Sequence, residues 1–109
     1  MPPNNHEPFC RDRIRVIRDG FGWVDHRLVR DRYIDHCSAP ALALYLFLVT
    51  VANPDGLSFW GDKAVCARLH LGQSELAEAR DELVAADLLA YEKPLYQVLQ
   101  LPKRARVKS

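Results

Sequence analysis

The sequence predicts one small α+β domain, and three observations support that prediction. Its 109 residues are about the size of a single domain, and 49% of them are hydrophobic, which is enough to build a packed core. Two stretches with helical periodicity, 62–69 and 73–86, are joined by the tight turn His70–Gly72. Two short strand-like segments, 88–91 and 96–101, follow these helices. Helices followed by a pair of strands are typical of an α+β fold.

The N-terminal residues predict a β-hairpin behind a loose arm. Residues 1–8 are polar and contain three prolines, so we expect a flexible arm there. Charged and β-branched residues alternate over Arg13–Val16, which is the period of a half-buried strand. The Asp19–Gly20 pair that follows favours a type I′ turn, which needs positive φ at both central positions. We therefore predict a hairpin with arms at 11–18 and 21–25.

Two helices are expected after this hairpin. Asp25 is a suitable cap for a short helix that runs to about Cys37 and completes an N-terminal unit over 9–37. Ser38 is a good N-cap for the next helix, which runs to about Ala52. This second helix is apolar nearly all round, so it belongs in the middle of a domain or of an oligomer. Together with Phe9, Phe21 and Trp23 it exceeds what a winged helix needs to bury, which predicts either a subunit interface, and hence a homodimer, or an extra layer made by the N-terminal hairpin.

The second half of the chain describes a winged helix-turn-helix at Gly61–Leu101, within a domain that spans 38–102. A short strand is expected at 57–60, before the two helices and their turn, and the strand pair behind them forms the wing. His70 and Asp87 stand at turns that usually need positive φ, which these residue types tolerate better than most. The apolar positions expected to pack the two helices together are Val65, Leu69, Leu71, Leu76, Ala79 and Leu83.

Three segments carry a resemblance to a known family: Ser38–Leu48, Val65–Leu71 and Leu83–Leu89. The chain resembles, over residues 38–101, the winged helix-turn-helix domains of bacterial, phage and plasmid regulators and replication-initiator proteins. The resemblance implies a regulator of transcription, replication or a mobile element that binds double-stranded DNA. It also implies that the second helix of the motif enters the major groove.

Charge is distributed unevenly along the chain. The net charge is only +1, but residues 9–36 carry a net +2, residues 37–101 a net −4, and the tail 103–109 is basic. The acidic region includes the second helix of the motif, whose outward positions hold four acids and a single cation, Arg80. Acids that face a phosphate backbone repel it, so we expect most of the attraction for DNA to come from elsewhere.

The predicted DNA contacts fall into two groups. Base contacts are expected from the start of the second helix, where a glutamine can pair with adenine in the major groove; these residues are Gln73, Ser74 and Ala77. Phosphate contacts are expected from cations on the first strand, the motif helices and the wing, namely Arg13, Arg15, Arg68, Arg80 and Lys93.

Two classes of function stay open. The first is a DNA-binding regulatory module, and the second is a winged helix that serves only for protein docking or dimerisation, which the acidic second helix favours.

We expect no enzyme activity, no cofactor, no metal and no small-molecule substrate, because no catalytic constellation, phosphate loop or metal-finger spacing occurs. The three cysteines predict free thiols, and the chain shows neither a signal peptide nor a membrane span, so a cytoplasmic protein is expected.

Overall fold

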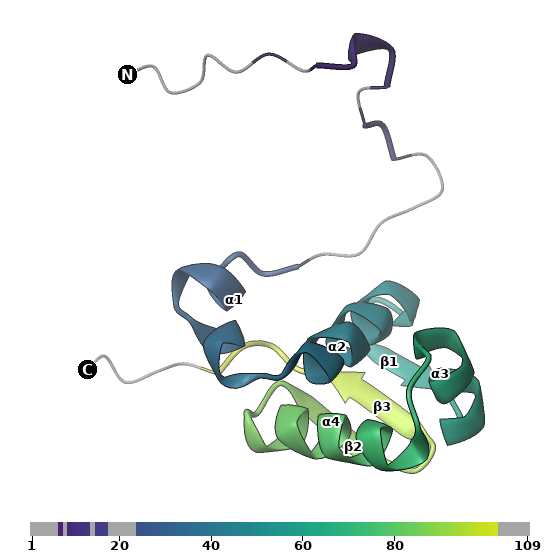
Figure 1. Ribbon diagram of the computed structural model, residues 1–109. Coiled ribbons are helices and arrows are strands. Elements are labelled where there is room, and N and C mark those ends of the chain that lie inside the picture. Colours follow the sequence, from purple (N-terminus) through teal and green to yellow (C-terminus); the bar gives the residue numbers. More distant parts are fainter. Residues whose placement is uncertain (1–6, 8, 14, 18–23, 103–109) are drawn as a thin grey trace.

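The computed structural model describes residues 7, 9–13, 15–17 and 24–102, and its folded body is α+β (Figure 1). Helices cover one face of a small antiparallel sheet, and the other face of the sheet is open. The elements are the 3-10 turn η1 (Arg11–Arg13), α1 (Arg27–Arg30), the 3-10 turn η2 (Tyr33–His36), α2 (Ala39–Val51), β1 (Leu57–Phe59), α3 (Asp62–Leu69), α4 (Gln73–Ala85), β2 (Leu89–Glu92) and β3 (Leu95–Val98).

The three strands pair in the order β1-β3-β2, with both pairs antiparallel. In this register Ser58 of β1 and Tyr91 of β2 both lie opposite Tyr96 of β3, on the face that the helices cover. Phe59 lies on the open face and is exposed. This arrangement of four helices and a three-stranded sheet is compatible with the winged helix-turn-helix that the sequence predicts.

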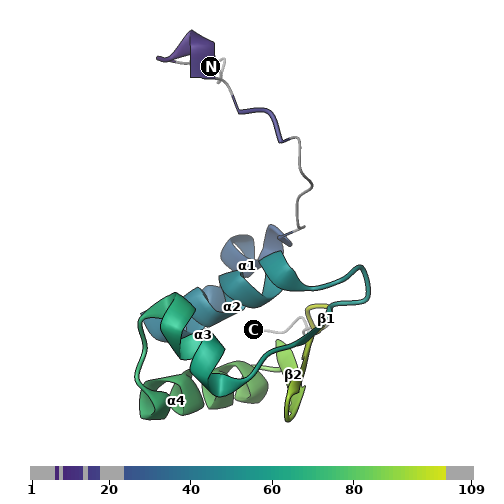
Figure 2. The same cartoon turned by 90° about the vertical axis from the view of Figure 1, so that its right-hand side faces the viewer.

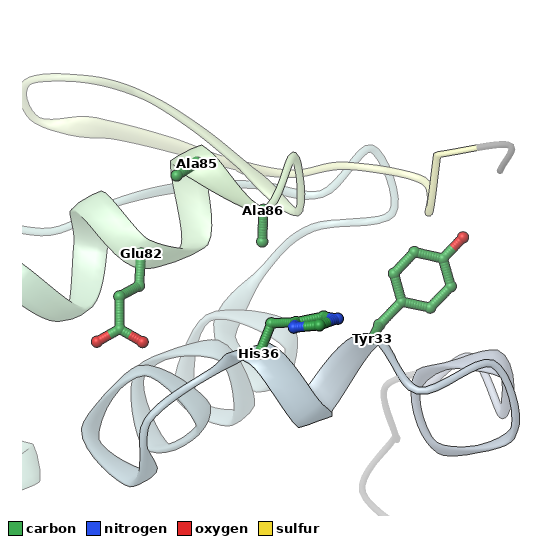
Figure 3. A pocket seen from close by; sticks show the side chains of 5 residues that line it. All are labelled: Tyr33, His36, Glu82, Ala85 and Ala86. Carbon is green, nitrogen blue, oxygen red and sulfur yellow. The ribbon is translucent and has the colours of Figure 1, made fainter. Parts of the chain in front are cut away.

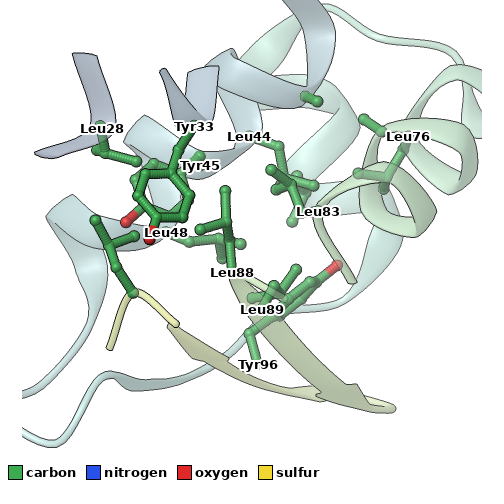
Figure 4. Close-up of a cluster of buried hydrophobic side chains, with 14 residues drawn as sticks. Leu28, Tyr33, Leu44, Tyr45, Leu48, Leu76, Leu83, Leu88, Leu89 and Tyr96 are labelled. Carbon is green, nitrogen blue, oxygen red and sulfur yellow. The ribbon is translucent and has the colours of Figure 1, made fainter. Parts of the chain in front are cut away.

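Leucines from α2, α4 and the start of β2 form the centre of the core (Figure 4). Leu44, Leu48 and Leu83 are fully buried, and Leu76 and Leu88 are only 1% exposed. Burial of each such side chain stabilises the fold by about 1.5–3 kcal/mol. The apolar positions predicted to join the two motif helices are confirmed, since Val65, Leu76, Ala79 and Leu83 are buried and Leu69 and Leu71 are half-buried.

The local signals at the helix ends are also confirmed. The Ser38 hydroxyl accepts a hydrogen bond from the backbone N–H of Ala41 at 3.3 Å, so Ser38 is the N-cap of α2. His70 and Asp87 have φ values of 57° and 65°, as expected at the ends of α3 and α4. At the second of these turns, the N–H of Leu88 reaches back to the carbonyl of Leu83 at 3.0 Å, which satisfies one of the last carbonyls of α4.

The predicted N-terminal hairpin is wrong over the residues that the structure describes. Arg11–Arg13 form a 3-10 turn, and neither 15–17 nor Val24 and Asp25 form a strand. An alternating pattern makes a strand only where a second layer covers its apolar side, whereas Val16 is 66% exposed here. The Asp19–Gly20 turn lies outside the described residues.

The single helix expected over 25–37 is split into α1 and η2. Arg32 between them has a left-handed conformation, with φ at 65°. Leu28 and Tyr33 are both 5% exposed, although residues five positions apart point about 140° away from each other on a continuous helix. The break at Arg32 lets both side chains reach the same core.

Two serine-to-alanine substitutions are expected to change stability in opposite directions. The Ser58 hydroxyl is buried and has no hydrogen-bond partner among the residues that the structure describes, so Ser58→Ala should raise the free energy of unfolding by about 1 kcal/mol. Ser38→Ala removes the N-cap of α2 and should lower it by about 1 kcal/mol. Urea unfolding of both variants measures the two changes, and a loss of stability in Ser58→Ala would contradict the assignment of its hydroxyl.

Candidate nucleic-acid interface

The outer side of α4 and the turn between β2 and β3 lie on the same side of the molecule, along the lower edge in Figures 1 and 2. The core side of α4 is fixed by Leu76, Ala79 and Leu83, which are at most 1% exposed. The opposite side of the helix therefore faces outward. Of the predicted base contacts, Gln73 and Ser74 are exposed at the start of the helix, and Ala77 is half-buried one turn later.

Two of the four acids on α4 are engaged in helix capping. The carboxylate of Glu75 accepts a hydrogen bond from the backbone N–H of Gly72 at 2.9 Å, within its own helix. Glu82 turns towards α2, where its two carboxylate oxygens accept the backbone N–H and the hydroxyl of Ser38, each at 2.8 Å. The remaining acids, Glu78 and Asp81, are exposed. Glu82 is thus directed away from the outer side of α4, whereas Glu75 stays exposed and keeps its negative charge there.

The hydrogen bonds from Ser38 also set the acidity of Glu82. The backbone N–H of Ser38 is the main cause that lowers the pKa of this carboxyl below its ordinary value, and the Ser38 hydroxyl adds to the effect. Spacing could have predicted the role of Glu75, which is three residues after an N-cap position. The partner of Glu82 is 44 residues away in the sequence, and no local pattern indicates it.

Arg80 is held between α4 and the β2–β3 hairpin. One guanidinium nitrogen donates to the carboxylate of Asp62 and to the hydroxyl oxygen of Tyr96, both at 3.0 Å. The guanidinium lies over the ring of Tyr91, with its central carbon 4.2 Å from the ring centroid. The Arg80 side chain is only 13% exposed. The sequence predicts Arg80 as a phosphate contact, but its low exposure and its hydrogen bonds to Asp62 and Tyr96 favour a structural role.

Two other predicted phosphate contacts are exposed on the folded body. Arg68 lies at the end of α3, with its guanidinium carbon 5.5 Å from the ring centroid of Trp60. The ring of Trp60 in turn packs edge-on against that of Phe47, with the centroids 4.9 Å apart, so the guanidinium of Arg68 lies over a ring that is itself packed against α2. Lys93 is exposed in the turn between β2 and β3. Lys63 at the start of α3, which the sequence interpretation did not single out, is exposed as well.

Arg13 and Arg15 stand apart from these cations. Both are exposed in the described part of the N-terminal segment, which Figure 1 draws away from the folded body. The structure therefore does not bring them next to Arg68 or Lys93.

A small pocket lies at the other end of α4 from the predicted base contacts. It has a volume of 360 Å³ and is lined by Tyr33, His36, Glu82, Ala85 and Ala86 (Figure 3). The hydroxyl of Tyr33 donates to the carbonyl of Pro102 at 2.6 Å, and the Glu82 carboxylate holds Ser38. Tyr33 and Glu82 are thus engaged in joining elements of the fold, which favours a structural role for these two residues.

Comparison with known proteins finds no protein-family model, curated protein or solved structure that matches the chain. Within the part of the chain that the structure describes, no three His, Cys, Asp or Glu side chains gather as a metal site would require, and no helix is long and apolar enough to cross a membrane. Function is therefore inferred from the geometry of the face that α4 and the hairpin form.

Removal of either partner in the Arg80–Tyr96 hydrogen bond should destabilise the fold, and the effects of the two removals on the free energy of unfolding should not be additive. We expect Arg80→Met and Tyr96→Phe together to cost less than the sum of the two single changes, by about 1 kcal/mol, because each one already breaks the bond. A double-mutant cycle from urea unfolding measures this coupling. Tyr91→Phe is the matched control, since it keeps the ring that Arg80 covers, and additive single effects would contradict the direct bond.

The stabilisation from Glu82 should depend on pH. Because its pKa is lowered in the folded state, the stabilisation is complete above the unfolded pKa and is lost as pH falls through the folded pKa. Glu82→Gln should therefore be less stable than the native chain near neutral pH, and the difference should shrink on acidification. Urea midpoints between about pH 7 and about pH 3 test this. A constant difference for Glu82→Gln over this range would contradict the prediction.

Proposed function

We propose that this protein is a DNA-binding regulatory module with a winged helix-turn-helix fold. In this proposal α4 enters the major groove of double-stranded DNA, and the β2–β3 hairpin is the wing. One observation carries the proposal: the first turn of α4 presents Gln73 and Ser74 outward, with Ala77 half-buried one turn later, while the carboxylate of Glu75 beside them caps Gly72. An amide and a hydroxyl at this position are groups that read base edges.

The layout of the elements supports the same proposal. The helices α3 and α4 are joined by the short turn His70–Gly72, and the strand pair that follows lies on the same side of the molecule as α4. Asp62 at the start of α3, Arg80 on α4 and Tyr96 on β3 are joined by hydrogen bonds, which fix the hairpin relative to α4. A duplex would thus meet a helix and a hairpin whose relative position is already set, which lowers the ordering cost of binding.

The attraction for phosphates comes from four exposed cations in this proposal. Lys93 lies in the β2–β3 turn, Arg68 lies at the end of α3 over Trp60, and Arg13 and Arg15 belong to the N-terminal segment and would have to approach the duplex from outside the folded body. Glu78 and Asp81 oppose them, because both are exposed on the outer side of α4. Affinity for a duplex is therefore expected to be modest and strongly dependent on salt.

A second candidate function is docking to another protein through the same face. It is favoured by the exposure of Glu78 and Asp81 together with Val84, which is 45% exposed on the same helix. Acidic and apolar side chains side by side suit a basic protein partner better than a phosphate backbone.

The salt dependence of binding to a duplex separates these two functions. Fluorescence anisotropy with a labelled pool of mixed-sequence duplexes, at about 50 mM and about 200 mM salt, should detect binding that weakens as salt rises. Arg68→Ala and Lys93→Ala should each weaken binding and reduce the slope of log affinity against log salt by about 1. Glu78→Gln and Asp81→Asn should strengthen it, because each removes a charge that repels phosphate.

Arg30→Ala is the matched control. Arg30 is an exposed arginine on α1, on the opposite side of the molecule from α4, and its loss should leave binding unchanged. If no duplex binds at either salt concentration, DNA binding is wrong and docking takes its place. If Arg30→Ala weakens binding as much as Arg68→Ala does, the assigned face is wrong.

A further inference from the structure

An apolar groove of 420 Å³ runs between α1 and the outer side of α2, away from the face that α4 and the hairpin form. Leu42, Leu46 and Val49 of α2 form one wall. The other wall includes Val29 of α1 and Ile34 of η2. All of the residues that line the groove lie within 24–49, a part of the chain that the structure describes. The groove is on a different surface from the proposed DNA interface.

The exposed apolar side chains of the folded body gather at this groove. Within residues 24–102, five large hydrophobic side chains are exposed, and Val24, Val29 and Leu46 all line it. Val29 is 68% exposed and Leu46 is 61% exposed, so both project from the surface beside the hollow. The same surface therefore carries projecting side chains and a depression, which is what a self-complementary interface needs.

The outer side of α2 has the spacing of a helix-pairing seam. Ala39, Leu42, Leu46 and Val49 follow one another at intervals of three, four and three residues, which is the a/d spacing of helices that pack side by side. The opposite side of α2, with Leu44 and Leu48, is already buried in the core. A second helix of the same kind is the natural partner of such a seam.

The charged side chains of the segment 25–35, which supplies one wall of the groove, favour a second copy of this chain over a strongly charged partner. They form three ion pairs with N–O distances of 2.7, 3.6 and 3.3 Å, and these are Asp25–Arg27, Arg30–Asp31 and Arg32–Asp35. Asp25 lines the groove itself, together with His26. The three acids and the three arginines balance, so this wall does not repel its own copy, and it gives no long-range attraction to a nucleic acid or to a highly acidic or basic protein.

We propose that a second copy of this chain covers the groove, in a twofold dimer in which Leu46 of each copy packs close to the axis. Leu46 lies in the middle of the seam between Leu42 and Val49, so it is the position at which a twofold interface brings a residue next to itself. The proposal does not rest on DNA binding. The dimer leaves α4 and the β2–β3 hairpin uncovered.

Measurement of mass in solution tests the dimer. Sedimentation equilibrium from about 1 μM to about 1 mM should show a mass that rises from 12.5 kDa to twice that value. Leu46→Asp should weaken self-association at least about 100-fold, because it places two like charges in an apolar contact. Phe59→Asp is the matched control, since Phe59 is 67% exposed on the open face of the sheet, and it should associate like the native chain. Circular dichroism verifies that both variants fold.

Disulfide trapping tests the position of the axis. In a background of Cys10→Ser, Cys37→Ser and Cys66→Ser, we expect Leu46→Cys to form a covalent dimer on oxidation, because a disulfide needs its two Cα atoms within about 4.4–6.8 Å. Phe59→Cys in the same background should not. The dimer proposal is overturned if the native chain stays at 12.5 kDa over the whole concentration range. It is also overturned if the Leu46→Asp variant dimerises as the native chain does. If the N-terminal segment of the same chain occupies the groove instead, the native chain should stay at the monomer mass of 12.5 kDa.

Discussion

The position of the β2–β3 hairpin relative to the helices depends on the guanidinium of Arg80. Its contacts with Asp62, Tyr96 and Tyr91 join α3, α4, β2 and β3 around one side chain. The leucines of the core stabilise the fold, but apolar contacts have no preferred direction. A planar cation with fixed donor directions does have one, and it therefore determines how the hairpin is oriented.

The charge that α4 presents to a partner depends on where each acidic side chain lies in the fold, and not only on the number of acids in the helix. The sequence assigns four acids to α4, yet Glu75 and Glu82 are turned to helix N-termini, and Arg80 is paired with Asp62. What remains on the outer side is a start with Gln73, Ser74 and the exposed Glu75, followed by the acids Glu78 and Asp81. The two proposed classes of partner differ mainly in which part of the helix they would contact.

Local signals predicted the body of the fold well. The helices α2, α3 and α4 lie within one residue of their expected bounds, because α3 and α4 have a clear apolar period, α2 is a continuous apolar run, and each helix has a recognisable end. The positive φ of His70 was inferred from its turn. Contacts between distant residues were not predictable: Ser38 and Glu82 are 44 positions apart, and Arg80 and Tyr96 are 16 apart. The hairpin expected near the N-terminus failed because alternation indicates a strand only where another layer covers it.

The bond between Glu82 and Ser38 has a consequence for how the protein opens. Glu82 lies in the last turn of α4, where helices fray most easily, and its carboxylate caps the first turn of α2. Fraying of α4 therefore also releases the backbone N–H of Ser38, although the Ser38 hydroxyl still caps Ala41, so we expect the end of α4 and the start of α2 to open together. Protection against exchange should accordingly rise and fall together in these two helix ends, although they are far apart along the chain.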